Sequence, residues 1–364
     1  MNERRSGILP AHELVSMVER GEIAIADPLQ DDQVQPASLD LRLGTVAYRV
    51  RASFLPGPGQ PVTEKLERLR LHAIDLTQGA VLETGCVYIV PLLEALALPA
   101  HVAATANPKS STGRIDVFTR VIADRSQEFD KIPAGYNGPL YLEISPRTFP
   151  VLVRTGSRLS QIRFRVGNAV LTDAELGYLH DSQRLMVSDR PPHISNGIAV
   201  SIDLEPSGET PVGYRAKRHT GVIDVDNKSG YDVLDFWEPV FLRRERELVL
   251  DPDEFYILAS REAVHVPPDH AAEMVPFDPL VGEFRVHYAG FFDPGFGHEA
   301  AGGAGSRAVL EVRSHEVPFI LEHGQIVGRL VYERMLEQPE TIYGSGMGSN
   351  YQAQGLKLSK HFRL

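Results

Sequence analysis

Cysteine is nearly absent from this chain of 364 residues, because Cys86 is the only one. A single cysteine excludes an internal disulfide and a metal cage built from thiolates. Long apolar runs are missing too. No stretch approaches the roughly 20 residues that a membrane-spanning helix needs, and the start, MNERRSGILP, lacks the apolar core of a signal peptide. We therefore expect a cytoplasmic protein that has no membrane partner.

An excess of positive charge is also missing. The chain has 37 Lys and Arg residues against 48 Asp and Glu residues, which gives a net charge of −11. This balance argues against a nucleic-acid binder that works through bulk charge, but a small anion held by a few local cations is compatible with it. The length suits two domains, or one large domain.

Short β segments dominate the first half of the chain. One short helix is predicted over residues 10–20, between a proline and a glycine. Residues 34–44, VQPASLDLRLG, alternate as a half-buried strand does, with Asp40 and Arg42 on the polar face. The segments that follow are rich in Val, Ile, Leu and Tyr and are cut by Gly, Pro and Asn. This pattern predicts a mainly β fold, either a sandwich or a barrel.

The second half repeats the first at one constant spacing. Five landmarks recur 168 positions later without a gap: Pro99 and Pro267, Pro108 and Pro276, Glu143 and Glu311, Pro150 and Pro318, and Gly156 and Gly324. A repeat in register indicates an internal duplication. The sequence therefore predicts two tandem β domains, residues 1–170 and 201–364. A linker over residues 171–200 joins them and carries a short helix-like piece.

Residues 107–114, NPKSSTGR, form the first candidate site. A lysine, two hydroxyls, a glycine and an arginine suit a phosphate chain, because charge-assisted hydrogen bonds to oxyanions are strong. The same composition is typical of a solvated loop. At the repeat spacing, other residue types stand in the second half: Lys109, Ser110, Ser111 and Arg114 correspond to Phe277, Asp278, Pro279 and Gly282. This loss beside preserved landmarks favours a phosphate-binding or catalytic role for the first-half set.

Glu143 is the second candidate. It lies in GPLYLEISP between apolar neighbours, and a carboxylate that is partly desolvated suits proton transfer. Two other interpretations stay open at this point. Glu143 could be a strand residue that faces water, or a structural acid common to both halves, since Glu311 recurs at the repeat spacing.

These motifs resemble those of the dCTP deaminases, homotrimeric relatives of the trimeric dUTP pyrophosphatases. VQPASLDLRLG is similar to the family's strand near the N-terminus, and KSSTGR to its Arg-Ser-Ser-x-x-Arg motif. RVIADR, followed by PAGYNGPLYLEI, is similar to the segment that holds the base and ends in the catalytic glutamate. The tail SNYQAQG resembles the C-terminal lid, and the length resembles the long, two-domain version of the family. The resemblance implies dUTPase-like domains of the distorted jelly-roll (β-barrel) type and a homotrimer.

The activity that the resemblance implies is hydrolytic deamination of dCTP to dUTP and ammonia, which supplies dUTP for dUMP and dTTP synthesis. Glu143 would be the general base that takes a proton from water, and the hydroxide would attack C4 of cytosine. Ser110 would position that water, and Arg114 would steady the glutamate and the developing charge. The implied substrate contacts are Lys109, Ser111 and Arg125 to the triphosphate, the main chain of Val121, Ile122 and Ala123 to the base, Tyr136 near the sugar, and Tyr351 and Gln354 in the lid.

Magnesium is the only cofactor that the resemblance implies, and it would enter with the substrate by bridging triphosphate oxygens, as hard cations do. Zinc is not expected. Zinc-dependent nucleobase deaminases hold the metal with a histidine and cysteines, in the signature H-x-E and P-C-x-x-C. One cysteine cannot supply that set, and none of the thirteen histidines lies in an H-E-x-x-H or H-x-E arrangement.

Three places differ from the family pattern. Lys109 stands where arginine is usual, and Asn350 stands where a lysine precedes the tail tyrosine. Residues 126–134, SQEFDKIPA, are longer than the family's short connection. A lysine keeps the charge of the arginine but cannot form its two-pronged contact with a phosphate.

Two alternatives compete with the deaminase. One is a dUTP pyrophosphatase, or a bifunctional form, in which Asp130 would activate a water aimed at the α-phosphate. The other is a nucleotide-binding β protein without turnover. The second domain is predicted to be a degenerate repeat that serves packing, with its C-terminal tail covering the site of the first.

Overall fold

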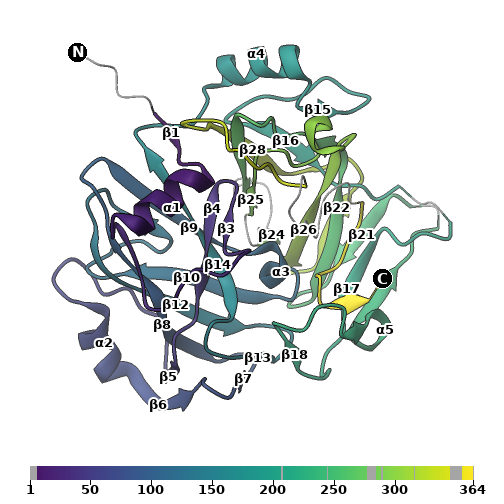
Figure 1. Cartoon of the computed structure of the whole chain (residues 1–364). Coiled ribbons are helices and arrows are strands. Elements are labelled where there is room, and N and C mark those ends of the chain that lie inside the picture. The colour runs from purple at the N-terminus through teal and green to yellow at the C-terminus, as the bar shows by residue number, and fades with distance from the viewer. Residues whose placement is uncertain are drawn as a thin grey trace, which may run out of the picture. The chain divides into compact units, whose positions relative to one another are not determined.

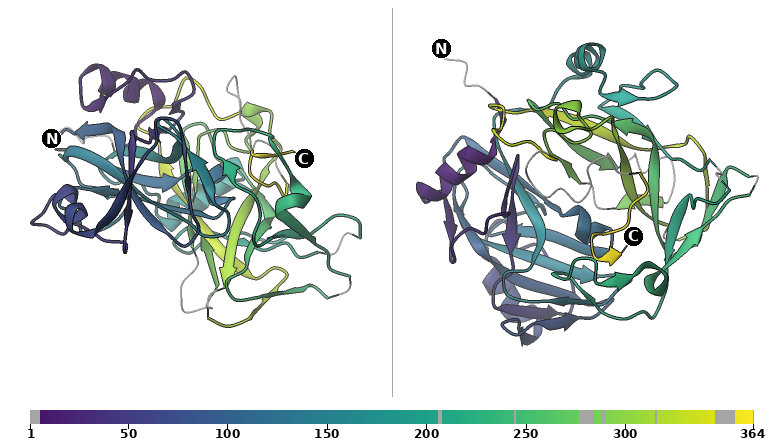
Figure 2. Two further views of the ribbon diagram at one scale, coloured as in Figure 1. Left: turned by 90° about the horizontal axis from the view of Figure 1, so that it is seen from below. Right: turned by 45° about the vertical axis from the view of Figure 1, so that its right-hand side comes forward.

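The computed structural model of the chain describes residues 6–205, 208–243, 245–276, 284–287, 290–314, 316–344 and 355–363. Figures 1 and 2 show many strands and few helices, so the predicted mainly β fold is confirmed. The chain divides into two compact units. Unit 1 comprises Met1–Ala169, His219–Gly230 and Met335–Glu340, and unit 2 comprises Val170–Arg218, Tyr231–Arg334 and Thr341–Leu364. Within the described segments, no helix combines the length and apolarity needed to cross a membrane.

In the described residues of unit 1, two six-stranded sheets and one smaller sheet are present. The first sheet has the order β11 (Lys131–Ile132), β9 (Val102–Pro108), β14 (Arg158–Val166), β4 (Ser38–Arg42) and β3 (Val34–Gln35), with β1 (Gly7–Ile8) also on β14. The second has the order β10 (Val117–Ala123), β12 (Asn137–Pro146), β8 (Val87–Ala97), β5 (Val46–Val50) and β6 (Arg70–Asp75), with β2 (Ile23–Ile25) also on β8. The third is β18 (Ile223–Asp224), β13 (Val151–Val153) and β7 (Ala80–Leu82).

Unit 2 has a similar organisation over its described residues. One sheet has the order β20 (Trp237–Val240), β17 (Gly213–Ala216), β22 (Phe255–Val264), β26 (Ser306–Ser314) and β24 (Phe284–His287), with β15 (Met186–Val187) also on β22. Another is β16 (Ile198–Ser201), β28 (Ile326–Arg334), β23 (His270–Pro276) and β25 (Phe291–Phe292). Two strand pairs complete it: β19 (Tyr231–Asp232) with β29 (Phe362–Arg363), and β21 (Glu247–Leu250) with β27 (Phe319–Glu322).

The helices are short and lie between strands. They are α1 (Ala11–Glu19), α2 (Val62–Leu69), α3 (Ser110–Gly113), α4 (Asp173–Gln183), α5 (Val233–Phe236) and the 3₁₀ helix η2 (Glu299–Ala301). The helix predicted over residues 10–20 is confirmed as α1, with Pro10 at its N-cap. At α4 the Thr172 side chain accepts from the Glu175 backbone N–H, and Glu175 accepts from the Thr172 N–H, a reciprocal cap that starts the helix.

The duplication extends to the hydrogen-bond register. Residues that pair across strands in unit 1 have partners in unit 2 that pair in the same way 168 positions later: Glu143 with Ile89 and Glu311 with Ile257, Ser160 with Pro108 and Gly328 with Pro276. Gly156 and Gly324 also share a positive φ, of 86° and 80°, which glycine adopts without steric cost. Both halves therefore follow one backbone plan.

The prediction that β4 is half-buried is wrong. Every residue from Ser38 to Arg42 is buried, including Asp40 at 1% exposure and Arg42 at 2%. β4 lies between β14 and β3 in the sheet, and its charged residues have partners of their own. Arg42 Nε donates to Glu94 Oε1 over 2.7 Å, and the Arg42 backbone N–H donates to Glu94 Oε2 over 2.8 Å. A buried ion pair thus replaces the expected solvent contact.

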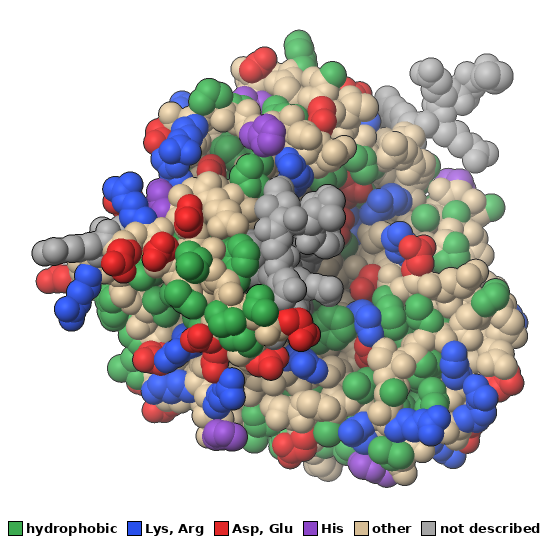
Figure 3. All heavy atoms as spheres, turned by 180° about the vertical axis from the view of Figure 1, so that it is seen from behind, with side chains coloured by type: hydrophobic (Ala, Val, Ile, Leu, Met, Phe, Trp, Pro, Cys, Tyr) green, Lys and Arg blue, Asp and Glu red, His purple; other side chains and the backbone are tan. Residues whose placement is uncertain are grey.

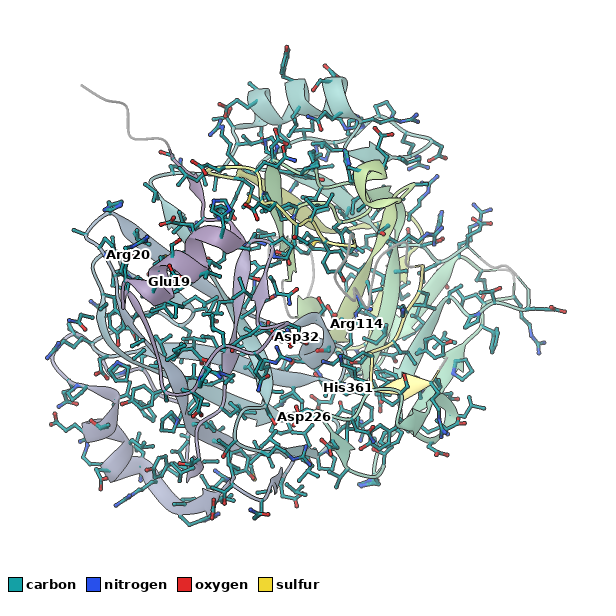
Figure 4. All side chains as sticks on the ribbon, viewed as in Figure 1. Glu19, Arg20, Asp32, Arg114, Asp226 and His361 are labelled. Carbon is teal, nitrogen blue, oxygen red and sulfur yellow. The ribbon has the colours of Figure 1, made fainter. Side chains whose placement is uncertain are left out.

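A short segment from the second half of the sequence completes the smallest sheet of unit 1. β18 pairs in parallel with β13. Arg154 donates to both carboxylate oxygens of Asp224, at 2.8 and 2.9 Å, and the Ser157 hydroxyl donates to Asp226 over 2.6 Å. Figure 4 shows Asp226 on this segment. The boundary between the units therefore does not follow the chain order.

The stretch predicted as a linker, residues 171–200, carries α4, β15 and the start of β16. β16 pairs with β28 and β15 pairs with β22, both inside unit 2. Leu176, Leu185 and Ile198 belong to the core of that unit. Because these apolar side chains are buried, the stretch is part of the packed unit 2.

Candidate functional site

Glu143 lies near the end of β12, with its side chain away from water. It is 1% exposed, so the interpretation of a solvent-facing strand residue is excluded. β12 is flanked by β8 on one side and β10 on the other. In the β10–β12 pair, Glu143 lies opposite Arg120.

The two oxygens of the Glu143 carboxylate differ. Oε1 accepts from Arg120 Nε over 3.0 Å and from Arg120 Nη2 over 2.6 Å. Oε2 is buried and has no hydrogen-bond partner among the described residues. A buried acceptor without a partner is costly, and it commonly marks a place that a water or ligand fills. The carboxylate is therefore anchored at one oxygen and available at the other.

Arg120 was not predicted from the sequence as a site residue. Its guanidinium carbon lies 3.5 Å from the centre of the Phe129 ring and 4.7 Å from that of Phe118, and its Nη2 donates to the Ser53 hydroxyl over 2.8 Å. Phe129 comes from the connection over residues 126–134. Arg120 is the first residue of RVIADR. Residue types alone do not indicate the strand register that places it opposite Glu143.

The NPKSSTGR stretch forms a turn of helix. Lys109 is the N-cap of α3, and its carbonyl accepts from the N–H groups of Thr112 and Gly113. Ser111 is 5% exposed and Ser110 is half-buried. α3 packs against β10 and β14. The stretch is therefore a packed element of unit 1 and not a solvated loop.

The two cations of this stretch, Lys109 and Arg114, have different partners. Lys109 Nζ donates to Asp40 Oδ2, so in the free chain this lysine is the partner of a buried acid. Arg114 lies at the C-cap of α3 (Figure 4), is 3% exposed, and its backbone N–H donates to the Ser110 carbonyl. Ser110 and Arg114 are thus held next to each other by one backbone hydrogen bond.

The segment predicted to hold the base is the strand β10. Both main-chain groups of Val121 contact Asp130: the Val121 N–H donates to Asp130 Oδ1 over 2.7 Å, and the Asp130 N–H donates to the Val121 carbonyl over 2.9 Å. Ile122 and Ala123 lie opposite Tyr141 and Leu140 of β12. The long connection therefore covers the edge of β10 at Val121.

Tyr136 is buried, whereas Arg125 is exposed. Tyr136 is 9% exposed; its hydroxyl accepts from the Asp124 N–H over 3.0 Å and donates to the Pro139 carbonyl over 2.6 Å. Burial raises the pKa of Tyr136 to about 12. Arg125 is exposed and has a φ of 59°. Tyr136 thus braces the backbone here, whereas Arg125 reaches solvent.

Several predicted positions lie outside the described residues: the lid residues Tyr351 and Gln354, and the second-half counterparts Phe277, Asp278, Pro279 and Gly282. Glu311, the counterpart of Glu143, is described and is 6% exposed.

The described residues contain no group of three or more His, Cys, Asp or Glu side chains placed to hold a metal ion. The thiol of Cys86 is half-buried. Figure 3 shows basic and acidic side chains interspersed over one face of the molecule.

Two family models match the chain. Residues 5–168 match the N-terminal domain of 2'-deoxycytidine 5'-triphosphate deaminase, and residues 172–362 match the C-terminal domain of the same family.

Among solved structures, the chain is similar to a crystal structure of 2'-deoxycytidine 5'-triphosphate deaminase from Agrobacterium tumefaciens. The sequences are 67% identical, the TM-score is 0.88, and the match covers 93% of this chain and 100% of the other. More distant relatives include a dCTP deaminase, dUMP-forming, from Beutenbergia cavernae and a dCTP deaminase from Sulfurisphaera tokodaii. Each is 29% identical over 43% of this chain and 78% of its own length.

Proposed function

The chain belongs to the 2'-deoxycytidine 5'-triphosphate deaminase family, and from this premise we propose that Glu143 drives the hydrolysis of dCTP to dUTP and ammonia. The chain is an enzyme, a dCTP deaminase and thus a hydrolase of nucleotide metabolism. The resemblance that the motifs indicated is confirmed. The observation that carries the proposed mechanism is Oε2 of Glu143, which is buried and has no hydrogen-bond partner among the described residues, next to an oxygen that Arg120 already holds.

In the proposed mechanism a water occupies the position beside Glu143 Oε2. Glu143 takes one proton of this water, and the hydroxide forms a bond to C4 of the cytosine ring. As the hydroxide bonds to C4, the double bond between C4 and N3 opens, and N3 takes the proton that Glu143 holds. Glu143 then takes the proton of the C4 hydroxyl and passes it to the exocyclic amine, the C4–N bond breaks, and ammonia leaves as the C4 carbonyl of uracil forms. A buried carboxylate suits this exchange, because no bulk water competes for its lone pair.

Ser110 and Arg114 are proposed to act on the same water and on the developing charge. Ser110 supplies a hydroxyl that orients the water, and Arg114 supplies a fixed positive charge. Their support is the geometry of α3, which joins them by a backbone hydrogen bond and packs against β10.

Lys109, Ser111 and Arg125 are proposed to bind the triphosphate. Lys109 would exchange its contact with Asp40 for a phosphate oxygen, and the exposed Arg125 is free to move toward one. Mg²⁺ would be held by the triphosphate itself, since the described residues offer no cluster for it. The ion would neutralise phosphate charge, and the reacting water would be activated by Glu143 without zinc.

The main chain of Val121, Ile122 and Ala123 is proposed to contact the base, with Tyr136 near the sugar. Because Asp130 now occupies the Val121 amide, base binding at that amide would displace this carboxylate. The lid residues Tyr351 and Gln354 are proposed to close over the nucleotide. Their test is the pair of variants Tyr351→Phe and Gln354→Ala, which should raise KM for dCTP and leave thermal stability unchanged.

Truncation is a poorer test of the lid. Phe362 of β29 packs against Tyr231, Phe236 and Trp237, with ring centres 5.5 to 6.4 Å apart. Cutting the chain before Gly344 would remove this aromatic contact together with the lid. A loss of activity in the truncated chain could then come from misfolding or from loss of the lid, and the experiment would not distinguish the two.

For the architecture we propose two domains of the dUTPase-like distorted jelly-roll type, the second a degenerate repeat that serves packing. The repeated strand register supports a common plan for both. We further propose a homo-oligomer, a trimer by resemblance. Light scattering coupled to size-exclusion chromatography would give its mass.

A second activity is worth separate measurement, because one relative similar to the chain is described as dUMP-forming. In that case Asp130 would activate a water toward the α-phosphate. Its carboxylate is tied to Val121 in the free chain, so this route also requires Asp130 to move.

The deciding experiment follows ammonia release and nucleotide products from dCTP and Mg²⁺ with the unmodified chain and with Glu143→Gln. We expect dUTP and ammonia in equal amounts, and a loss of about 10²- to 10⁴-fold in kcat for the variant, the range for a positioned general base. dUMP with pyrophosphate would establish the bifunctional form. An unchanged rate for Glu143→Gln would overturn the proposed role.

A further inference from the structure

Within the described residues, Arg120 donates twice to Oε1 of Glu143, whereas Oε2 is buried and has no hydrogen-bond partner. We propose that Arg120 positions Glu143 for the reaction by fixing Oε1, so that Oε2 faces the attacking water, and that Phe129 in turn fixes Arg120. The proposal rests on the function proposed above. Arg120 acts through Glu143, because a guanidinium stays protonated and exchanges no proton itself.

A second buried glutamate in unit 1, Glu94, has partners at both oxygens. Glu94 Oε1 accepts from Arg42 Nε and from Gln33 Nε2, at 2.7 and 2.9 Å, and Glu94 Oε2 accepts from the Arg42 backbone N–H at 2.8 Å. Both oxygens are satisfied. Glu143 differs because both of its hydrogen bonds converge on one oxygen.

The two bonds from Arg120 restrict rotation of the carboxylate. Turning the carboxylate away from this orientation would break both contacts, at 3.0 and 2.6 Å, and only a half-turn, which exchanges two equivalent oxygens, would restore them. A general base works only when its lone pair points at the proton it takes, and small displacements cost large factors in rate. Arg120 therefore restricts rotation of the Glu143 carboxylate and keeps one oxygen directed at the attacking water.

Arg120 is itself fixed from three directions. Phe129 stacks on its guanidinium, with 3.5 Å between Cζ and the ring centre, Phe118 lies at 4.7 Å, and Ser53 accepts from Nη2. Phe129 also packs against the small core cluster of unit 1 that includes Tyr141. The long connection over residues 126–134 thereby contributes an aromatic clamp to the catalytic carboxylate.

The test compares Arg120→Ala, Arg120→Lys and the control Arg20→Ala in steady-state deamination of dCTP. Arg20 also holds two carboxylates, Glu13 and Glu22, but lies at the exposed end of α1, apart from Arg114 in Figure 4. We expect Arg120→Ala to lower kcat by about 10- to 100-fold with little change in KM, the size of a misplacement effect. Arg120→Lys should be intermediate, and Arg20→Ala should match the unmodified chain.

Added guanidinium at millimolar concentration should restore part of the kcat of Arg120→Ala and leave Arg20→Ala unaffected. A structural role would not give this rescue. If Arg120→Ala does not fold, Arg120→Lys decides, because it keeps the charge and loses only the two-pronged geometry. Thermal unfolding establishes which variants fold.

Phe129 is tested by Phe129→Leu, which keeps an apolar side chain and removes the ring face, and by Phe129→Tyr, which keeps the face. We expect kcat to fall about threefold to tenfold for the leucine variant, the scale of a partly buried cation–π contact. The tyrosine variant should remain near the unmodified rate. Equal rates for both would remove Phe129 from the proposal.

The outcomes separate this inference from the proposed function. Loss of activity in Glu143→Gln with normal kcat in the folded Arg120 variants would overturn the role of Arg120 and keep Glu143 as the base. Full activity in Glu143→Gln would overturn both. A rise in KM alone for Arg120→Ala would assign Arg120 to substrate binding and overturn positioning.

Discussion

Lys109 donates from Nζ to the carboxylate of Asp40, and so joins the residue before α3 to the buried strand β4. Asp40 is 1% exposed, and Arg158 Nη1 lies 3.4 Å from the same Asp40 oxygen. The lysine that the motif assigned to phosphate is therefore the counter-ion of a buried acid in the free chain. A triphosphate has to compete with that acid.

Lys109→Ala should affect both binding and stability. The variant leaves the buried Asp40 with Arg158 alone, so we expect the free energy of unfolding to fall by about 1–3 kcal/mol and KM for dCTP to rise. Lys109→Arg should recover most of both, since it keeps the charge. Urea unfolding and steady-state kinetics measure the two effects. Lys131→Ala, which breaks an exposed pair with Glu128, is the control, and equal stability of the two alanine variants would contradict the prediction.

The buried pair Arg42–Glu94 should matter far more to stability than an exposed pair. Glu94→Ala leaves the Arg42 guanidinium buried without its anion, which we expect to cost about 3–5 kcal/mol. Glu13→Ala breaks the exposed contact to Arg20 and should cost less than about 1 kcal/mol. Chemical denaturation of both variants gives the comparison. A loss for Glu94→Ala as small as that for Glu13→Ala would refute it.

Residues 1–170 alone should fold poorly, because unit 1 also needs the segment His219–Gly230. Without it, β13 loses its partner β18 and Arg154 loses the two-pronged contact with Asp224. We expect the fragment to melt at a clearly lower temperature than the same fragment extended by a Gly/Ser linker and residues 219–230. Circular dichroism on heating measures this. Equal melting temperatures would show that the segment contributes nothing.

His265 should make unit 2 less stable in mild acid. Burial, followed by the neighbouring His298 at 6.4 Å between ring centres, lowers the pKa of His265 below 6.5, and its Nε2 has no hydrogen-bond partner among the described residues. Below pH 6.5 the unfolded chain binds a proton that the folded chain does not, so stability falls as pH falls toward the folded pKa.

The measurement is the melting temperature of the unmodified chain and of His265→Asn between about pH 5 and 7.5, a range that brackets an ordinary histidine pKa. The variant should lose part of the pH dependence. Burial also lowers the pKa of His180, so some dependence should persist. An identical pH profile for both chains would show that His265 does not titrate as described.

The fold class could be predicted because it rests on local patterns. Short apolar segments separated by Gly, Pro and Asn indicated strands, and landmarks such as Gly156 and Gly324 carried the duplication. The candidate Glu143 was found because an acid among leucines is unusual. Its burial could not be predicted, since alternation places a residue on a face without saying what covers that face.

Arg120 could not be predicted because its role depends on register. A strand pair can shift by one residue without any change in composition, and only the observed pairing puts Arg120 opposite Glu143. The same holds for Asp40 and Arg42, whose polar pattern suggested solvent. Their partners Lys109 and Glu94 come from distant parts of the sequence.

The sequence by itself determined a mainly β chain with a duplicated plan, the candidate site motif and the family to which they point. These properties depend on residue type and spacing along the chain. Only the tertiary structure decided which oxygen of Glu143 is held, that Phe129 clamps Arg120, and that residues 219–230 complete unit 1. Those relationships depend on distances between segments far apart in sequence, and such distances are fixed by packing and strand register.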